Sequence, residues 1–184
     1  MNRNTLLKWF LIWAILMVVL VIATLPDQRP EKIDTVGFDT TESAELYFKN
    51  VRSFYYTKKE EGEGIFDVYR LNSLFSDSTA TLPFAIYHNW RSNEGFIRLD
   101  TSRMAQGKYS AIQIDSSRIM IKQLDLPSMN NESQYLFAKE VYKALRDEKR
   151  ISVVTENDSI EVGESTSISI ERTLTDYFRL VGKI

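Results

Sequence analysis

The chain has 184 residues, with 23 Lys and Arg against 25 Asp and Glu, a formal net charge of -2 at pH 7, and no cysteine. This near-balance of charge argues against nucleic acid as a partner, because phosphate binding requires a basic surface. The lack of cysteine excludes disulfides, thiolate metal ligands and cysteine nucleophiles.

The first predicted element is a membrane-spanning signal-anchor helix over residues 6–25, preceded by a short tail of residues 1–5. The 17 residues from Trp9 to Leu25 carry no charge, and as a helix they would extend about 26 Å. Extending the segment to residue 6, with the Lys8 side chain reaching back to the headgroups, gives about 30 Å, the thickness of a hydrocarbon core.

The two ends of this segment fit a bilayer. Trp9 and Trp13 lie where tryptophan favours the membrane interface, and Leu25 is the last apolar residue before Pro26, which ends the helix. The short tail favours a cytoplasmic N-terminus, with the C-terminal part on the outer side of the cell membrane, periplasmic or extracellular. The lipid bilayer is therefore the first expected partner, contacted through residues 6–25.

A cleavable signal peptide is the alternative interpretation of the same segment. Arg3 and Lys8 would form its basic region, and Val21-Ile22-Ala23 is a tolerable cleavage site. The apolar run exceeds the length of about 7–15 residues that is usual in a signal peptide, which favours the uncleaved anchor. Under either interpretation the rest of the chain crosses a membrane.

Residues 26–39 are predicted to be a polar linker, and residues 40–184 a single domain. The domain begins with a helix over about residues 41–50, whose first turn offers hydroxyl groups for capping and acidic side chains. Residues 51–57 and 65–71 are rich in β-branched and aromatic side chains. They predict two strands joined by a charged hairpin that contains glycine.

Four further strands are predicted in the middle of the domain. The run over residues 81–90 contains Pro83, so it forms an edge strand or begins after the proline. A turn connects it to a strand over residues 96–100. Two runs of alternating apolar and polar residues follow, over residues 109–115 and 118–124.

The last part of the chain predicts a helix, a hairpin and a second helix. Asn131 is the predicted cap of the first helix, and the apolar stripe that follows it has helical spacing. Residues 151–155 and 160–162 predict the hairpin, and an amphipathic helix over residues 174–181 closes at Gly182. The order of the elements predicts an α+β domain with a mainly antiparallel sheet and about three helices.

A short repeat occurs in two of the predicted strands. One pattern of apolar, polar, apolar, Asp, hydroxyl, Ser and Arg describes both Ile97-Arg98-Leu99-Asp100-Thr101-Ser102-Arg103 and Ile112-Gln113-Ile114-Asp115-Ser116-Ser117-Arg118. Both copies lack the glycine that follows Asp-Thr or Asp-Ser in aspartic proteases, so we expect no catalytic pair of that kind. We interpret each copy as a strand ended by an Asp-hydroxyl turn.

The relative direction of the two strands would decide whether their aspartates meet. If the strands are parallel neighbours, Asp100 and Asp115 lie at the same edge of a sheet. If the strands are antiparallel neighbours, which their short link favours, the two carboxyl groups lie at opposite ends of the sheet.

Few residues suggest catalysis. His88 is the single histidine, so a Ser-His-Asp triad or a histidine-bearing zinc site would have to use it, and we interpret it as a partly exposed hairpin residue. No nucleotide-binding, zinc-protease or hydrolase motif is present. The acidic residues Glu60, Glu61 and Glu63 lack EF-hand spacing and adjoin two lysines. We therefore expect no metal site and no cofactor, and we assign no catalytic residue.

A polar face of the predicted sheet is the candidate binding surface. Strand alternation places Arg98 with Asp100, and Gln113 with Asp115, opposite the apolar residues of their strands. The candidate binding surface consists of Trp90, Arg91, Arg98, Asp100, Gln113 and Asp115. The residues assigned to membrane anchoring are Trp9, Trp13 and Leu25.

Together these patterns predict a single-pass membrane protein whose extracytoplasmic domain binds or helps to assemble other membrane or envelope proteins without catalysis. One alternative is a small-ligand-binding module with a pocket among Tyr55, Tyr56, Tyr69, Tyr87 and Trp90. A second alternative is a hydrolase that uses carboxylates alone, for which Asp100 and Asp115 are the best pair.

Overall fold

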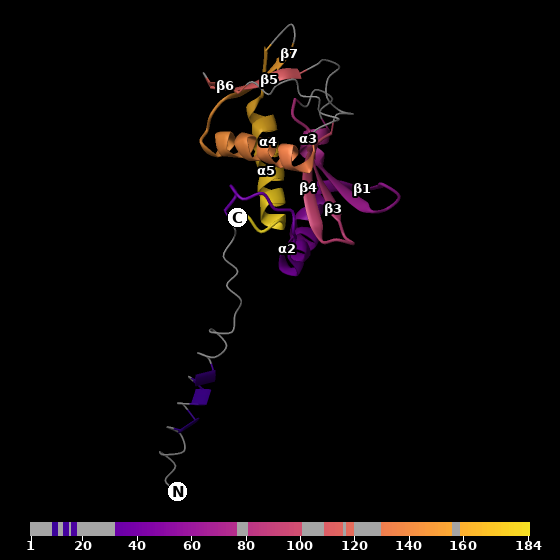
Figure 1. Cartoon of the computed structure of the whole chain (residues 1–184), viewed down its shortest axis with the longest axis vertical. Coiled ribbons are helices and arrows are strands. Elements are labelled where there is room, and N and C mark those ends of the chain that lie inside the picture. The colour runs from indigo at the N-terminus through magenta and orange to yellow at the C-terminus, as the bar shows by residue number, and fades with distance from the viewer. Residues whose placement is uncertain are drawn as a thin grey trace. The chain divides into compact units, whose positions relative to one another are not determined.

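The chain is described by a computed structural model in which two units are distinguished (Figure 1). These units are Met1–Pro30 and Glu31–Ile184. The residues that the structure describes are 9–10, 13–14, 16–17, 32–76, 81–100, 109–115, 117–119, 130–155 and 159–184.

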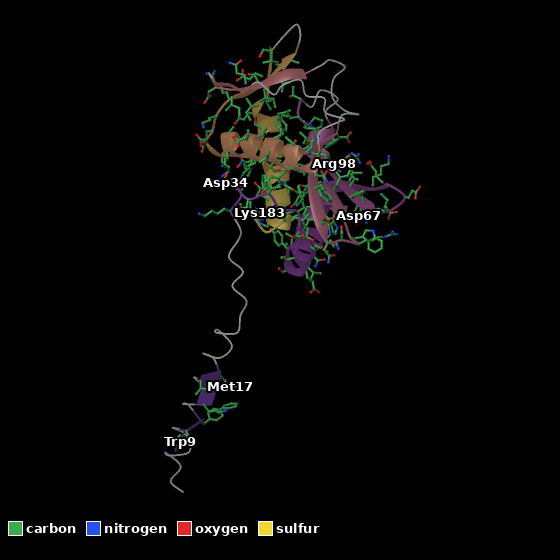
Figure 2. All side chains as sticks on the ribbon, viewed as in Figure 1. Trp9, Met17, Asp34, Asp67, Arg98 and Lys183 are labelled. Carbon is green, nitrogen blue, oxygen red and sulfur yellow. The ribbon has the colours of Figure 1, made fainter. Side chains whose placement is uncertain are left out.

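The predicted anchor over residues 6–25 lies largely outside the described residues. Trp9 and Trp13 are described and are helical and exposed (Trp9 is labelled in Figure 2), whereas Leu25 is not among the described residues. In the described part of the chain, no helix is both long enough and apolar enough to cross a membrane. The membrane anchor therefore stays a prediction from the sequence.

The first sheet of the larger unit is an antiparallel meander in the order β1-β2-β3-β4. Its strands are β1 (Tyr56–Glu61), β2 (Phe66–Leu71), β3 (Phe84–Asn89) and β4 (Glu94–Leu99). The β1–β2 hairpin turns through Gly62 and Gly64, both at positive φ, where glycine meets no steric penalty. β3 begins directly after Pro83 and lies inside the sheet. The prediction that this strand begins after the proline is confirmed, and the alternative of an edge strand is wrong.

The second sheet is also antiparallel and has the order β6-β5-β7-β8. Its strands are β5 (Tyr109–Ile114), β6 (Ser117–Ile119), β7 (Ile151–Thr155) and β8 (Ser159–Glu161). Buried side chains alternate along its two inner strands, at Ile112, Ile114, Ile151 and Val153. One face of this sheet is therefore apolar and belongs to the core.

The described α-helices are α2 (Glu42–Tyr47), α3 (Asn72–Phe75), α4 (Asn131–Arg146) and α5 (Glu164–Leu180). The two long helices, α4 and α5, pack on each other (Figure 1). α4 is capped by Asn130, whose side chain accepts a hydrogen bond from the Ser133 amide at 2.8 Å, and not by Asn131 as predicted. The α+β class with antiparallel strands is confirmed, with four α-helices described instead of about three.

The predicted strand over residues 51–57 is wrong for most of its length. α2 continues into a π-helix, η1 (Phe48–Arg52), and a 3₁₀ helix, η2 (Ser53–Tyr55), and β1 begins only at Tyr56. The Phe48 ring is buried against Tyr56 and Tyr69, with centroid distances of 5.5 and 5.0 Å. This tertiary packing overrides the local preference of aromatic and β-branched residues for strands.

α5 forms much of the core against the first sheet. Its Leu174, Tyr177 and Phe178 side chains are fully buried. At Gly95 in β4, an added Cβ would lie 3.1 Å from a methyl carbon of Val181, just beyond the end of α5. The close approach of helix and strand therefore depends on the absence of a side chain at this position.

Candidate functional site

The two copies of the repeat lie in different sheets. Ile97 and Leu99 belong to β4, at one edge of the first sheet, whereas Ile112 and Ile114 belong to β5, inside the second sheet. The two strands are therefore neither parallel nor antiparallel neighbours, and both of the expected arrangements are wrong. What the copies share is local: a strand whose apolar residues are buried and which ends at an aspartate.

Asp100 is buried and forms an internal ion pair. It follows β4 with 7% of its surface exposed, and its Oδ2 accepts a hydrogen bond from Arg70 Nε at 2.6 Å. Arg70 Nη2 also donates to Glu61 Oε1 at 2.7 Å. Burial lowers the pKa of Arg70, but its hydrogen bonds to Glu61 and Asp100 outweigh this effect and raise it. This cluster joins β1 and β2 to the end of β4.

Asp115 lies in the turn between β5 and β6 with a positive φ of 49°. Its Oδ1 accepts a hydrogen bond from the Arg150 amide at 3.1 Å, and Gln113 Nε2 donates to its carbonyl oxygen at 3.0 Å. Asp115 is exposed, in contrast to the buried Asp100. The two carboxylates therefore follow strands of different sheets and have different partners, Arg70 for Asp100 and the Arg150 amide for Asp115.

The remaining residues of the predicted binding surface form two further sets. Trp90 Nε1 donates to the Gly64 carbonyl at 3.2 Å, and the Arg91 guanidinium carbon lies 5.1 Å from the centroid of the Trp90 ring. Arg98 lies over the Tyr87 ring at 5.1 Å, and its Nη2 donates to Asn131 Oδ1 at 2.7 Å (Arg98 is labelled in Figure 2). The six predicted residues are thus spread over several local environments.

His88 is buried, and the prediction of a partly exposed histidine is wrong. Its Nε2 lies 3.1 Å from Glu45 Oε1, which also accepts a hydrogen bond from the Thr40 hydroxyl at 2.5 Å. Burial raises the pKa of Glu45, but hydrogen bonds from Thr40, His88 and Lys49 outweigh it and hold that pKa below 4.5. Strand alternation places His88 on the face of the sheet that the helices cover. Its contact with Glu45 therefore connects β3 to α2.

The tyrosines of the predicted ligand pocket are divided between different places. Tyr56 and Tyr69 are buried against Phe48 on the helix-covered face of the first sheet. By strand alternation, Tyr87 points to the opposite face, where its ring contacts Phe66. The tyrosines of the expected pocket therefore lie on opposite faces of the first sheet, and the small-ligand-binding alternative stays a prediction.

A surface that the sequence patterns did not locate lies on the helical segment before β1 and on α5. Five large side chains of this segment stay exposed, namely Leu46, Tyr47, Val51, Phe54 and Tyr55. Phe54 is 77% exposed, which is unusual for a phenylalanine in an ordered element. We call these five residues, together with Arg172 and Arg179 of α5, the aromatic–arginine surface.

The two arginines of α5 lie over the two tyrosines of this surface. The Arg172 guanidinium carbon is 4.0 Å from the centroid of the Tyr55 ring. Arg179 Nη1 donates to the Tyr47 hydroxyl at 3.1 Å, and its guanidinium carbon is 5.3 Å from that ring. Cation–aromatic contacts of this kind join α5 to the segment before β1 at Tyr47 and Tyr55.

A buried ion pair lies beneath the same surface. Arg52 in η1 donates to both carboxylate oxygens of Asp176 in α5, at 2.7 and 2.9 Å, and the Tyr56 hydroxyl donates to Asp176 Oδ2 at 2.7 Å. The Arg52 guanidinium carbon also lies 5.2 Å from the Tyr55 ring. The hydrogen bond to Asp176 raises the pKa of Arg52, and burial, reinforced by the Asp176 charge, raises that of Tyr56. Both donors therefore keep their protons, and the pairing with Asp176 fixes the Arg52 guanidinium that contacts the Tyr55 ring.

One signal in the sequence points to this surface. Tyr47, Val51 and Tyr55 are spaced by four residues, which places side chains on one side of a helix. This spacing does not distinguish a helix from a strand, because residues four positions apart also share a face in a strand. The β propensity of residues 51–57 therefore favoured the strand prediction. The pairing with Arg172 and Arg179 joins residues more than 100 positions apart and has no local signature.

The chain matches no protein-family model, no curated protein and no solved structure. Among the residues that the structure describes, no group of three or more His, Cys, Asp or Glu side chains is placed to hold a metal ion. The aromatic–arginine surface is therefore the feature from which a function can be argued.

Proposed function

We propose that this protein is a single-pass membrane protein whose extracytoplasmic α+β domain binds and helps to assemble other membrane or envelope proteins. The observation that carries the binding role is the aromatic–arginine surface, on which five large apolar side chains remain exposed. The uncharged run from Trp9 to Leu25 supports the anchor.

The composition of the surface supports protein binding. Tyr, Phe and Arg are enriched at the centres of protein interfaces, and contiguous exposed apolar patches commonly mark interaction sites. The segment also contains η1, and π-helical turns occur frequently at functional sites. Because Arg172 and Arg179 already hold the two tyrosine rings, a partner would lose little side-chain entropy on binding them.

The residues with catalytic potential support a binding role over a hydrolytic one. Asp100 is engaged by Arg70, Asp115 by the Arg150 amide, and His88 by Glu45. General acid or base catalysis needs a group that can reach a substrate proton, and the buried Asp100 and His88 serve internal contacts instead.

The membrane part of the proposal is tested by extraction and by topology. Membranes that contain the full chain are washed with alkaline carbonate, and the protein is expected to stay in the pellet. A reporter fused after Ile184 that is active only outside the cytoplasm is expected to be active. Release by carbonate would contradict the anchor, and a reporter active only in the cytoplasm would contradict the orientation.

The binding part is tested with Phe54→Asp, which places a charge at the most exposed apolar position of the surface. Gentle cross-linking followed by purification in detergent is expected to recover a partner with the unchanged protein, and at least about tenfold less with the variant. Leu136→Asp is the matched control, because Leu136 is also exposed but lies on α4. Equal recovery with both variants would rule out this surface as the binding site.

A further inference from the structure

We infer that the partner docks on the aromatic–arginine surface with an apolar polypeptide segment whose carboxylates pair with Arg172 and Arg179. This inference rests on the proposed binding function and adds the chemistry of the partner to it. Two observations support it: the surface bears positive charges, and an apolar partner that docks there would bury those charges.

The two α5 arginines are the uncompensated charges of this surface. Within the described part of the chain, Arg172 contacts the Tyr55 ring and Arg179 the Tyr47 hydroxyl, and neither has a carboxylate partner. Arg52, by contrast, is paired with Asp176. The surface thus keeps two positive charges although the chain as a whole has a formal charge of -2.

An apolar partner that covers Val51 and Phe54 would also remove water from these guanidinium groups. Burying a charge without a counter-charge is unfavourable, whereas a carboxylate can accept two parallel hydrogen bonds from one guanidinium. A purely apolar segment would therefore bind poorly. A segment that carries carboxylates among its apolar side chains satisfies both parts of the surface.

The same charges disfavour two other occupants. In a twofold dimer each copy presents the same patch to the other, so the arginines of the two copies would be brought into one interface without added acidic groups. Polybasic segments that bind anionic membranes carry clusters of about 4–8 Lys or Arg. Two uncompensated arginines on this surface are few by comparison.

The spacing of the arginines sets the spacing of the carboxylates. Arg172 and Arg179 are seven residues apart on α5, which is about 10 Å along the helix axis. A partner helix that runs beside α5 would match this distance with acids at positions i and i+7. A partner in the polyproline II conformation, which has three residues per turn and a rise of about 3.1 Å per residue, would match it with acids at i and i+3.

The test places a photoreactive amino acid at Val51 in the full-length chain and irradiates native membranes. The cross-linked segment is then identified by mass spectrometry. We expect a protein segment with at least two carboxylates about 10 Å apart in its helical or extended form. We also expect the cross-linking yield of the otherwise unchanged chain to fall as the salt concentration is raised, because salt screens exposed ion pairs.

The charge requirement is tested by reversing both arginines, Arg172→Glu with Arg179→Glu. The yield is expected to fall at least about tenfold, because like charges then meet in the interface. The matched control reverses Lys59 in β1 and Arg150 just before β7, two exposed cations away from α5, and should leave the yield unchanged. A neutral pair, Arg172→Gln with Arg179→Gln, should give an intermediate loss, and circular dichroism checks that each variant is folded.

The outcomes separate this inference from the proposed function. If Phe54→Asp abolishes the cross-link while the arginine variants and added salt leave it intact, the binding function stands and the acidic partner is ruled out. Adducts with a lipid, with a second copy of this chain or with a segment that lacks carboxylates would also overturn the inference. If neither Phe54→Asp nor the arginine variants affect the cross-link, both proposals fail.

Discussion

Arg52 and Asp176, which are 124 residues apart in the sequence, form an ion pair with two parallel hydrogen bonds of 2.7 and 2.9 Å. The Asp176 side chain is almost fully buried, and the pair joins η1 to α5. Because the Arg52 guanidinium also lies against the Tyr55 ring, this contact connects the stability of the core with the shape of the aromatic–arginine surface.

We expect Arg52→Met to lower the free energy of unfolding by about 3–5 kcal/mol, because it leaves the buried Asp176 carboxylate without its counter-charge. Urea denaturation of the full chain measures this loss. The double variant Arg52→Met with Asp176→Leu should recover at least half of it, since no buried charge then remains. Arg146→Met on α4, whose ion pair with Glu171 is exposed, should cost less than about 1 kcal/mol. A similar cost at positions 52 and 146 would contradict the buried pair.

The two aspartates of the repeat should respond differently to the same substitution. Asp100→Asn should cost about 2 kcal/mol, because it removes the charge that faces Arg70, although Arg70 retains Glu61. Asp115→Asn should change the free energy of unfolding by less than about 0.5 kcal/mol. Asparagine tolerates a positive φ and can accept the same hydrogen bond from the Arg150 amide. Thermal and urea unfolding measure both variants, and equal effects would contradict the two environments described above.

Gly95 should not accept a larger residue. A Cβ there would lie 3.1 Å from Val181 Cγ1, 3.4 Å from Thr40 Cγ2 and 3.5 Å from Leu180 Cδ2, so Gly95→Val should cost about 2–3 kcal/mol through overpacking. The control is Gly163→Ser at the start of α5, where a Cβ meets nothing within 4 Å and serine is a favourable cap. This control should be neutral or slightly stabilising in urea denaturation. Tolerance of valine at position 95 would show that α5 and β4 are not closely packed.

Tyr69 should make stability depend on alkaline pH. Burial first, and then the charge and hydrogen bond of Asp67, raise the pKa of Tyr69 from 10.0 to about 12. The folded state therefore favours the neutral phenol, so the contribution of Tyr69 is intact below pH 10 and is lost as the pH rises from about 10 to about 12. Urea midpoints measured between pH 8 and pH 12 should decline less steeply in Tyr69→Phe than in the unchanged protein. An identical decline would exclude this role.

Local sequence patterns predicted several strands and both long helices. Alternation marked β5, composition marked β2, the predicted hairpin over residues 151–162 marked β7, and Pro83 marked the start of β3. Apolar spacing marked α4 and the second half of α5, because hydrogen bonding within a helix and alternation along a strand depend on residues near one another in the chain. Helix boundaries were less accurate: Asn130, not Asn131, caps α4, since either asparagine offers the same side-chain acceptor.

The candidate site was much less predictable than the fold. Strand alternation placed Arg98 and Asp100 on a polar face, yet burial and Arg70 gave Asp100 a structural role. His88 became a buried partner of Glu45 once α2 covered its side of the sheet. In each case the side chain acquired its role from a residue 30 or more positions away, and such contacts leave no pattern in the local sequence.

The sequence by itself determined the α+β class, the antiparallel character of the strands and the turn chemistry that ends them, because these depend on short-range periodicity and on residues such as Gly62, Pro83 and Asp115. Only the tertiary structure decided that β4 and β5 belong to different sheets and that residues 51–55 are helical. Strand pairing, and the conformation of a segment whose sequence fits both helix and strand, depend on which distant side chains bury one another. In residues 51–55, the packing of Phe48 and the pairing of Arg52 with Asp176 outweigh the local preference for a strand.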